Sequence, residues 1–146
     1  GDGPVTVGPA VPTLAEATES ARAALAALRA APAWPAAPRP VFAGDLLPER
    51  ALAGDVAARR VLRQEIYGAL VRAGGELLET LDAFLATGGV LESTARALYV
   101  HPNTVRYRLR RVGEITGLSP TVAREAFTLH IALTIGRLDP VTTPHP

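Results

Sequence analysis

The stretch Thr94-Ala-Arg-Ala-Leu-Tyr-Val-His-Pro-Asn-Thr-Val-Arg-Tyr-Arg-Leu-Arg-Arg-Val112 decides the fold of this chain. It predicts two helices joined by a tight turn, the first over about residues 91–98 and the second beginning at Pro102. Proline suits the first helical position, because a missing N–H costs nothing there and its fixed φ is already helical. His101 is then the expected N-cap. The pattern therefore predicts a helix-turn-helix over about residues 91–114.

The second helix is amphipathic. Its apolar residues recur at i, i+4 and i+7, a stripe that must pack on a core, and they are Val105, Leu109 and Val112. The opposite side carries Asn103, Arg106, Tyr107 and Arg110, and Arg111 lies on a flank. Between Glu92 and Glu114 there is no acidic residue. Charge for phosphates and planar groups for base edges are what a polyanion such as DNA requires. Arg108 lies on the flank and is expected to pair with one of these two acids.

The preceding helix is expected to pack closely on the second. Ala95 and Leu98 are placed to contact Val105, and Ala95 is small enough for the close crossing of a helix-turn-helix. Val100 is expected to fill the corner between the helices. Tyr99 stands where many helix-turn-helix proteins have glycine, so we expect its φ to stay out of the left-handed region.

At these residues the chain resembles a known family. Residues 94–98 and 100–109, with the string His-Pro-Asn-Thr-Val-Arg-Tyr-Arg-Leu, resemble the C-terminal DNA-binding domain of the PucR/CdaR family of bacterial transcriptional regulators. The resemblance covers about residues 75–138. It implies binding of double-stranded operator DNA, usually as a dimer, with a variable sensory region upstream. Residues 45–50 and 55–67 are also similar to a subset of actinobacterial PucR-like regulators, including those linked to fatty-acid biosynthesis operons.

The candidate DNA contacts are His101, Asn103, Thr104, Arg106, Tyr107, Arg110 and Arg111. Each has an alternative role. Arg106 and Arg110 could be a solvated helix face, and Asn103 could cap the helix locally. Tyr107 either stacks on the sugar-phosphate backbone or packs against its neighbours. His101 is expected to act as a cap, although a protonated histidine near phosphate is also compatible with its position.

The distribution of charge supports the DNA interpretation better than its total. The chain of 146 residues has a net charge of only +1. Residues 89–124 hold six arginines against two acids, a local charge of +4, whereas residues 1–88 hold eight arginines against ten acids. All fifteen basic residues are arginine, which with the abundance of Ala, Gly and Pro suggests a bacterial genome of high GC content. Positive charge is therefore concentrated around the motif.

Composition argues against several other functions. The chain has no cysteine, which excludes disulfides, thiolate nucleophiles and cysteine-based metal sites. Its three histidines are far apart and lack ligand spacing, so no metal or cofactor is expected. No paired carboxylates, phosphate loop or catalytic triad can be argued, which predicts that the protein is not an enzyme. No apolar run approaches the ~20 residues of a membrane span, and no signal peptide is evident, so a cytoplasmic location without membrane contact is expected.

The N-terminal half predicts an appendage and a linker. In residues 1–30, a short Val-Thr-Val strand precedes a helix that a capping box of Thr13 and Glu16 opens. This order resembles the tail of an upstream sensory domain, so we expect a C-terminal fragment of a longer protein. The alternative is a free-standing small regulator with a frayed N-terminus. Residues 31–45 contain four prolines and predict an extended, semi-rigid linker, with Trp34 either anchored in the core or exposed.

Residues 46–138 are expected to form a helical DNA-binding domain. Its helices are predicted at residues 46–53, 55–72, 76–87, 91–98, 102–116 and about 119–138. Asp55 should cap the second of these, whose stripe is Leu62, Ile66 and Leu70. Gly117 should stop the helix before it, and Ser119-Pro120 should restart the last helix. The last helix has apolar residues on more than one face and could also supply a dimer interface. Residues 139–146 are expected to be disordered.

These observations predict an all-α fold: a helix-turn-helix within a small helical bundle, with an N-terminal helix and a Pro-rich linker. The expected function is sequence-specific binding of operator DNA by a homodimer, with any effector bound by an upstream domain. The alternative is a protein-interaction or dimerisation module that keeps the helix-turn-helix shape without binding DNA. That alternative predicts few exposed arginines on the second helix.

Overall fold

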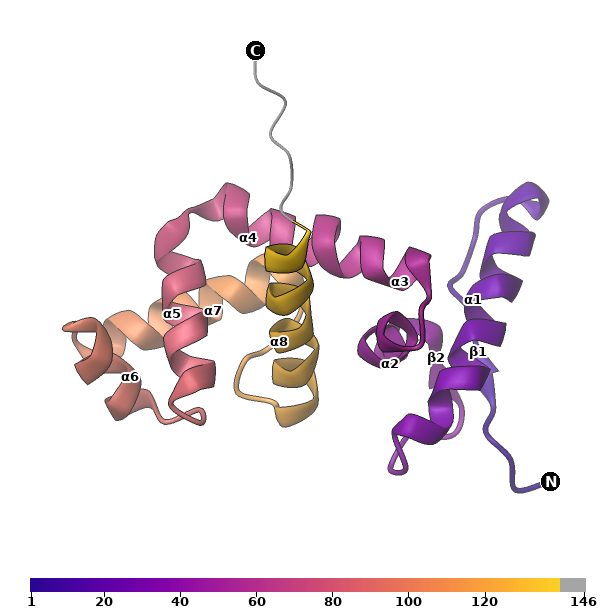
Figure 1. Cartoon of the computed structure of the whole chain (residues 1–146), viewed down its shortest axis with the longest axis horizontal. Coiled ribbons are helices and arrows are strands. Elements are labelled where there is room, and N and C mark those ends of the chain that lie inside the picture. Colours follow the sequence, from indigo (N-terminus) through magenta and orange to yellow (C-terminus); the bar gives the residue numbers. More distant parts are fainter. Residues whose placement is uncertain (140–146) are drawn as a thin grey trace, which may run out of the picture. The chain divides into compact units, whose positions relative to one another are not determined.

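The structure is a computed structural model that describes residues 1–139 of the chain. The predicted all-α class is confirmed in the main, because nearly all regular structure is helical (Figure 1). A small two-stranded parallel sheet is the exception. The chain divides into two compact units, residues 1–60 and 61–146. Most of the tail that was expected to be disordered, residues 140–146, lies outside the described residues.

The first unit places one long helix beside a minimal sheet. Strand β1 pairs in parallel with β2, with Thr6 opposite Val41 and Val7 opposite Phe42. The elements of this unit are β1 (Thr6–Val7), η1 (Leu14–Glu16), α1 (Ala17–Ala30), η2 (Ala31–Ala33), β2 (Val41–Phe42), η3 (Ala43–Leu46), α2 (Leu47–Leu52) and α3 (Val56–Arg60).

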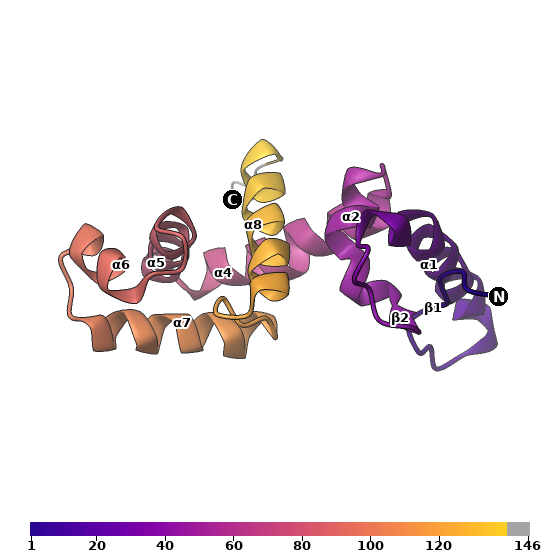
Figure 2. The same cartoon turned by 90° about the horizontal axis from the view of Figure 1, so that it is seen from below.

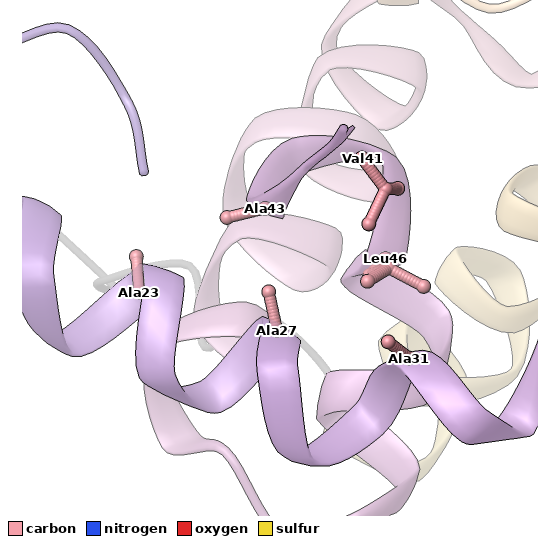
Figure 3. Close-up of a cluster of buried hydrophobic side chains, with 6 residues drawn as sticks. All are labelled: Ala23, Ala27, Ala31, Val41, Ala43 and Leu46. Carbon is pink, nitrogen blue, oxygen red and sulfur yellow. The ribbon is translucent and has the colours of Figure 1, made fainter. Parts of the chain in front are cut away.

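Alanine dominates the core of the first unit. The buried cluster shown in Figure 3 consists of Ala23, Ala27, Ala31, Val41, Ala43 and Leu46. Ala23 and Ala27 of α1 and Ala31 at the start of η2 recur every four residues, so their small side chains form a shallow face on which β2 and η3 lie close. Trp34 packs against this cluster and is partly buried, which agrees with its expected role as an anchor.

Residues 31–45 differ from the extended linker that their prolines predicted. Ala31–Ala33 forms the 3-10 helix η2, and Val41–Phe42 forms β2. Val41 and Ala43 are each 1% exposed. The segment packs into the first unit because its apolar residues pack against the alanine face of α1, which lies earlier in the chain. Proline density indicated the lack of a long helix but not this burial.

One expected N-cap forms and another does not. The carboxylate of Asp55 accepts from the backbone N–H of Ala57 at 3.0 Å and of Ala58 at 3.4 Å, as predicted. Thr13 is extended but makes no side-chain capping bond. The helix that was predicted to begin there opens instead with the 3-10 turn η1 and ends at Ala30 as expected.

The second unit is wholly helical within its described residues. Its elements are η4 (Val61–Tyr67), α4 (Gly68–Ala73), α5 (Gly75–Ala86), α6 (Leu91–Leu98), α7 (Pro102–Thr116) and α8 (Ala123–Leu138). The predicted helix over residues 55–72 is helical throughout except that η4 has π-helical winding. Its predicted stripe is buried, with Leu62 and Leu70 at 0% and Ile66 at 6% exposed. The boundary between the two units falls within this helix, after Arg60, and the expected domain over residues 46–138 stays a prediction.

Helix α8 packs most extensively on η4. Gly136 lies directly against the ring of Tyr67, and a Cβ atom at position 136 would overlap that ring. Glycine is therefore required there by close packing rather than by φ. Helix α8 begins at Ala123, later than the Ser119-Pro120 pair predicted. It ends at Leu138 as expected.

The helix-turn-helix forms within the predicted bounds. Helices α5, α6 and α7 contact one another, and Figure 2 shows α7 running along one side of the other two. Their shared core consists of Phe84, Ala95, Val105 and Leu109, with Leu91 and Val100 packed against it. The predicted closeness of Ala95 to Val105 and the predicted corner role of Val100 are thus confirmed.

The expectation for Tyr99 is wrong. Its φ is 55° and its ψ is 40°, which is the left-handed region. The N–H of Val100 donates to the carbonyl oxygen of Ala95 at 3.0 Å. This bond and the burial of Val100 match a Schellman ending, in which the residue between must be left-handed. Packing of Val100 therefore imposes on Tyr99 a conformation that its side chain disfavours.

Replacing Tyr99 by glycine is expected to stabilise the second unit by about 1 kcal/mol, because glycine has no Cβ to clash in the left-handed region. Tyr99 is 96% exposed, so little packing is lost. Urea unfolding followed by far-UV circular dichroism measures the change. Ala97→Gly, at an exposed helical position of α6, is the control and should destabilise by about 1 kcal/mol. A Tyr99→Gly variant that is less stable than the parent chain would contradict backbone strain at Tyr99.

Candidate nucleic-acid interface

The front of α7 is built as the sequence predicted. His101 is extended, with φ of −69° and ψ of 145°, and its Nδ1 accepts from the N–H of Asn103 at 3.0 Å. Pro102 occupies the first turn. A histidine that accepts at Nδ1 carries its proton on Nε2 when neutral. The expected cap role of His101 is confirmed, and its Nε2–H remains as a donor.

The outer face of α7 is exposed. Of the predicted contact residues on α7, Thr104 is half-buried. The exposed ones are Asn103, Arg106, Tyr107, Arg110 and Arg111. The guanidinium of Arg106 donates to Oδ1 of Asn103 at 2.8 Å. Asn103 thus orients a neighbour instead of capping the helix. This bond reduces the freedom of both side chains, and so lowers the entropy cost of ordering them on a partner.

Arg108 does not pair with either acid that was predicted. Its guanidinium lies 3.4 Å from a carboxylate oxygen of Glu76 and donates to Oγ1 of Thr80 at 3.3 Å. Both partners are on α5, so Arg108 ties α7 to the scaffold, as its flank position suggested. Glu114 pairs instead with Arg111, whose guanidinium donates to it at 2.5 Å. Residues at i and i+3 are neighbours on one helix, so Arg111 and Glu114 can pair without the packing of another element.

These pairings leave two arginines of α7 uncompensated. Among the described residues, neither Arg106 nor Arg110 forms an ion pair. Both charges are exposed on one side of α7, at i and i+4. The face is therefore a positive patch with planar hydrogen-bond donors, which suits phosphate oxygens and base edges.

A groove runs beside this patch. It encloses about 540 Å³. Arg106 and Arg110 of α7 line it together with Ser119 and Thr121, which precede α8. The Ser119-Pro120 pair predicted only a helix start here, and the proximity of these hydroxyl residues to the arginines was not predicted. Two hydroxyls flanking a proline soon after an arginine-rich helix were the available signal.

No described helix has the length and hydropathy needed to cross a bilayer. Histidines and carboxylates do not gather anywhere in the described part in a group of three or more that could hold a metal ion.

The fold and the face of α7 together define a helix-turn-helix protein. A small-residue crossing between α6 and α7, a partly buried valine at the corner and an exposed basic second helix are the features of this class. Comparison with known families is more specific: residues 77–135 match the PucR C-terminal helix-turn-helix domain. This part of the chain belongs to that family of transcriptional regulators.

Similar proteins agree with this assignment. An uncharacterized protein of Mycobacterium tuberculosis is 49% identical over 144 residues, which is 99% of this chain and 34% of the relative. The purine catabolism regulatory protein of Bacillus subtilis is 42% identical over 62 residues, 42% of this chain and 12% of that protein. The crystal structure of a regulator of polyketide synthase expression from Bifidobacterium adolescentis superposes with a TM-score of 0.86 at 42% identity, covering 96% of this chain and 56% of that one.

The chain spans about a third of the length of the mycobacterial relative. The relatives cited above that carry a functional name are named as regulators. For the helix-turn-helix domain, the prediction of a regulator rather than an enzyme is confirmed.

Proposed function

We propose that this chain binds operator DNA sequence-specifically, with α7 in the major groove. The observation that carries the proposal is the pair Arg106 and Arg110. Both are exposed on the outer face of α7, which packs on α5 and α6, and neither forms an ion pair within residues 1–139. A merely solvated helix face would be expected to interleave acids with its arginines. The same observation argues against an interaction module that has lost DNA binding.

Each expected contact has a role in this proposal. Asn103, Arg106 and Arg110 reach base edges, where an arginine pairs bidentately with guanine and an asparagine with adenine. Asn103 can do so while bonded to Arg106, because a carbonyl oxygen has two lone pairs. Nε2–H of His101 and the hydroxyl of Thr104 donate to phosphates at the helix N-terminus. Tyr107 and Arg111 are further contacts that position α7 on the DNA.

The test is binding of the purified chain to its own promoter fragment and to a scrambled duplex of equal length over a salt series. Salt-sensitive binding that prefers the promoter supports the proposal, because released counterions make affinity fall with salt while base contacts discriminate sequence. Equal binding to both duplexes would contradict sequence specificity. No binding at low salt would favour the interaction module.

We also propose that the regulator acts as a homodimer through α8. Phe127, Ile131, Thr134 and Leu138 follow a spacing of four, three and four residues, which places them on one stripe. Phe127 is 40% and Leu138 68% exposed, so the stripe is only partly covered in the chain. A two-fold dimer would present two α7 helices to half-sites about one helical turn, ~34 Å, apart.

Phe127→Ala is expected to weaken this dimer by about 1.5–3 kcal/mol, because it removes a large apolar side chain from the stripe. Sedimentation equilibrium measures the dissociation constant. Leu52→Ala is the matched control, since Leu52 is 70% exposed on α2 and lies outside the stripe. Equal dissociation constants for both variants and the parent chain would place the dimer contact elsewhere.

We propose further that residues 1–30 end an upstream sensory domain that binds any effector. A two-stranded parallel sheet is marginal by itself, and parallel sheets normally have both faces covered. Here Val5, Val7 and Phe42 remain 42%, 37% and 56% exposed. Hydrogen exchange at the Val41 amide, which donates to Val5 at 2.9 Å, tests this. Exchange should slow in the full-length gene product, and equal exchange in both would contradict the proposal.

A further inference from the structure

The groove beside α7 has two chemically different parts. Its floor is apolar and consists of Phe84, Leu91, Leu109 and Pro120. Its polar groups are the guanidinium groups of Arg106 and Arg110 and the hydroxyls of Ser119 and Thr121. None of the residues that line it is acidic. A ligand that fits must be anionic along its edge and less polar between its charges, as the phosphates and deoxyriboses of a DNA strand are.

The hydroxyls have donor capacity to spare. Oγ of Ser119 and Oγ1 of Thr121 lie 2.9 Å apart and share one hydrogen bond. The pair has two O–H hydrogens, and whichever residue donates within it, one hydrogen remains. An acid close to this pair, Glu125, accepts with its carboxylate from the backbone N–H of Ser119 at 3.3 Å. It does not line the groove.

The groove is continuous with the proposed DNA-binding face, because Arg106 and Arg110 belong to both. We propose that one strand of the DNA duplex lies along this groove, and that Ser119 and Thr121 bind a backbone phosphate there. The inference rests on the proposed DNA binding and adds a contact outside the helix-turn-helix. The segment between α7 and α8 then fixes how far α7 enters the major groove, while the bases are contacted by α7 alone.

The test compares the double variant Ser119→Ala/Thr121→Val with the parent chain on the promoter fragment and the scrambled duplex. We expect about tenfold weaker binding to both duplexes, because a hydrogen bond to a charged group is lost. The dependence on salt should stay unchanged, since neutral hydroxyls displace no counterions. The matched control is Thr18→Val, which removes an exposed hydroxyl of α1 that does not line the groove. Circular dichroism verifies that each variant folds.

A second variant and a modified DNA test whether the two hydroxyls contact a phosphate. Thr121→Asp should bind more weakly than the double variant, and added salt should narrow that difference, because a carboxylate repels the phosphate. A scan of promoter duplexes with single methylphosphonates should find one position that weakens the parent chain but not the double variant. Unchanged binding by both variants would overturn the inference while leaving DNA binding intact. A parent chain that binds neither duplex would overturn the proposed function and this inference together.

Discussion

The double variant Arg106→Ala/Arg110→Ala is expected to lose most of its affinity for promoter DNA. A bidentate contact from arginine to a base contributes about 1–3 kcal/mol of discrimination, so two independent contacts would contribute about 2–6 kcal/mol. Both side chains are exposed and neither forms an ion pair among the described residues, so they are available to DNA without breaking a bond to an acid.

The losses of binding free energy in the two single variants are not expected to be additive. Arg106 and Arg110 lie one helical turn apart, and loss of Arg106 also releases Asn103, which it orients at 2.8 Å. Arg106→Ala should therefore cost more than Arg110→Ala. Fluorescence anisotropy on the promoter fragment and on the scrambled duplex measures each value.

The control for the arginine pair removes the same charge elsewhere. Arg22→Ala/Arg29→Ala changes two exposed arginines of α1 and leaves α7 intact. A larger loss on promoter than on scrambled DNA assigns Arg106 and Arg110 to bases. An equal loss on both assigns them to phosphates, with a salt dependence reduced by about one counterion for each residue. A loss no greater than that of the control would contradict their place at the interface.

Asp55→Ala is expected to destabilise the first unit by about 3–5 kcal/mol, because it leaves a buried charge without its partner. Nε of Arg50 donates to Asp55 at 2.9 Å, and the side chains are 7% and 17% exposed. The second guanidinium contact of Arg50 is the carbonyl oxygen of Ala43, at 3.0 Å. The same substitution removes the N-cap of α3, which adds to the cost.

Trp34 provides the measurement, since it is the one tryptophan of the chain and packs on the core of the first unit. Its fluorescence during guanidinium unfolding follows that unit. Asp55→Asn separates the two effects, because an amide oxygen keeps the cap while the charge is lost. Glu19→Ala is the control: it breaks an ion pair with Arg22 whose side chains are 68% and 53% exposed, and should cost less than about 1 kcal/mol. Equal midpoints for Asp55→Ala and this control would contradict the prediction.

Local features of the helix-turn-helix were predictable from the sequence. The bounds of α6, the start of α7 at Pro102 and the cap at His101 depend on residues within one turn of each other. The buried stripe of α7 follows from the helical period for the same reason. The stop at Gly117, which has φ of 73°, is equally local.

Other features depend on residues that are distant in the sequence, and there the predictions failed or were silent. The left-handed φ of Tyr99 follows from the burial of Val100 against the core. The pairing of β1 with β2 joins residues about 35 positions apart, and it turns an expected linker into part of a core. The hydrophobic pattern within either segment does not predict such a contact.

That α7 is an amphipathic helix with arginines on one face follows from the order of its residues, because side-chain spacing and capping act over a few residues. Which of those arginines form ion pairs within residues 1–139 depends instead on how the helices pack. Arg108 is neutralised by Glu76 because α5 packs beside α7, whereas Arg106 and Arg110 face a groove in which no acid lies. Ion pairs between elements form only where packing brings the charges within a few ångströms, and the linear order of residues does not contain that distance.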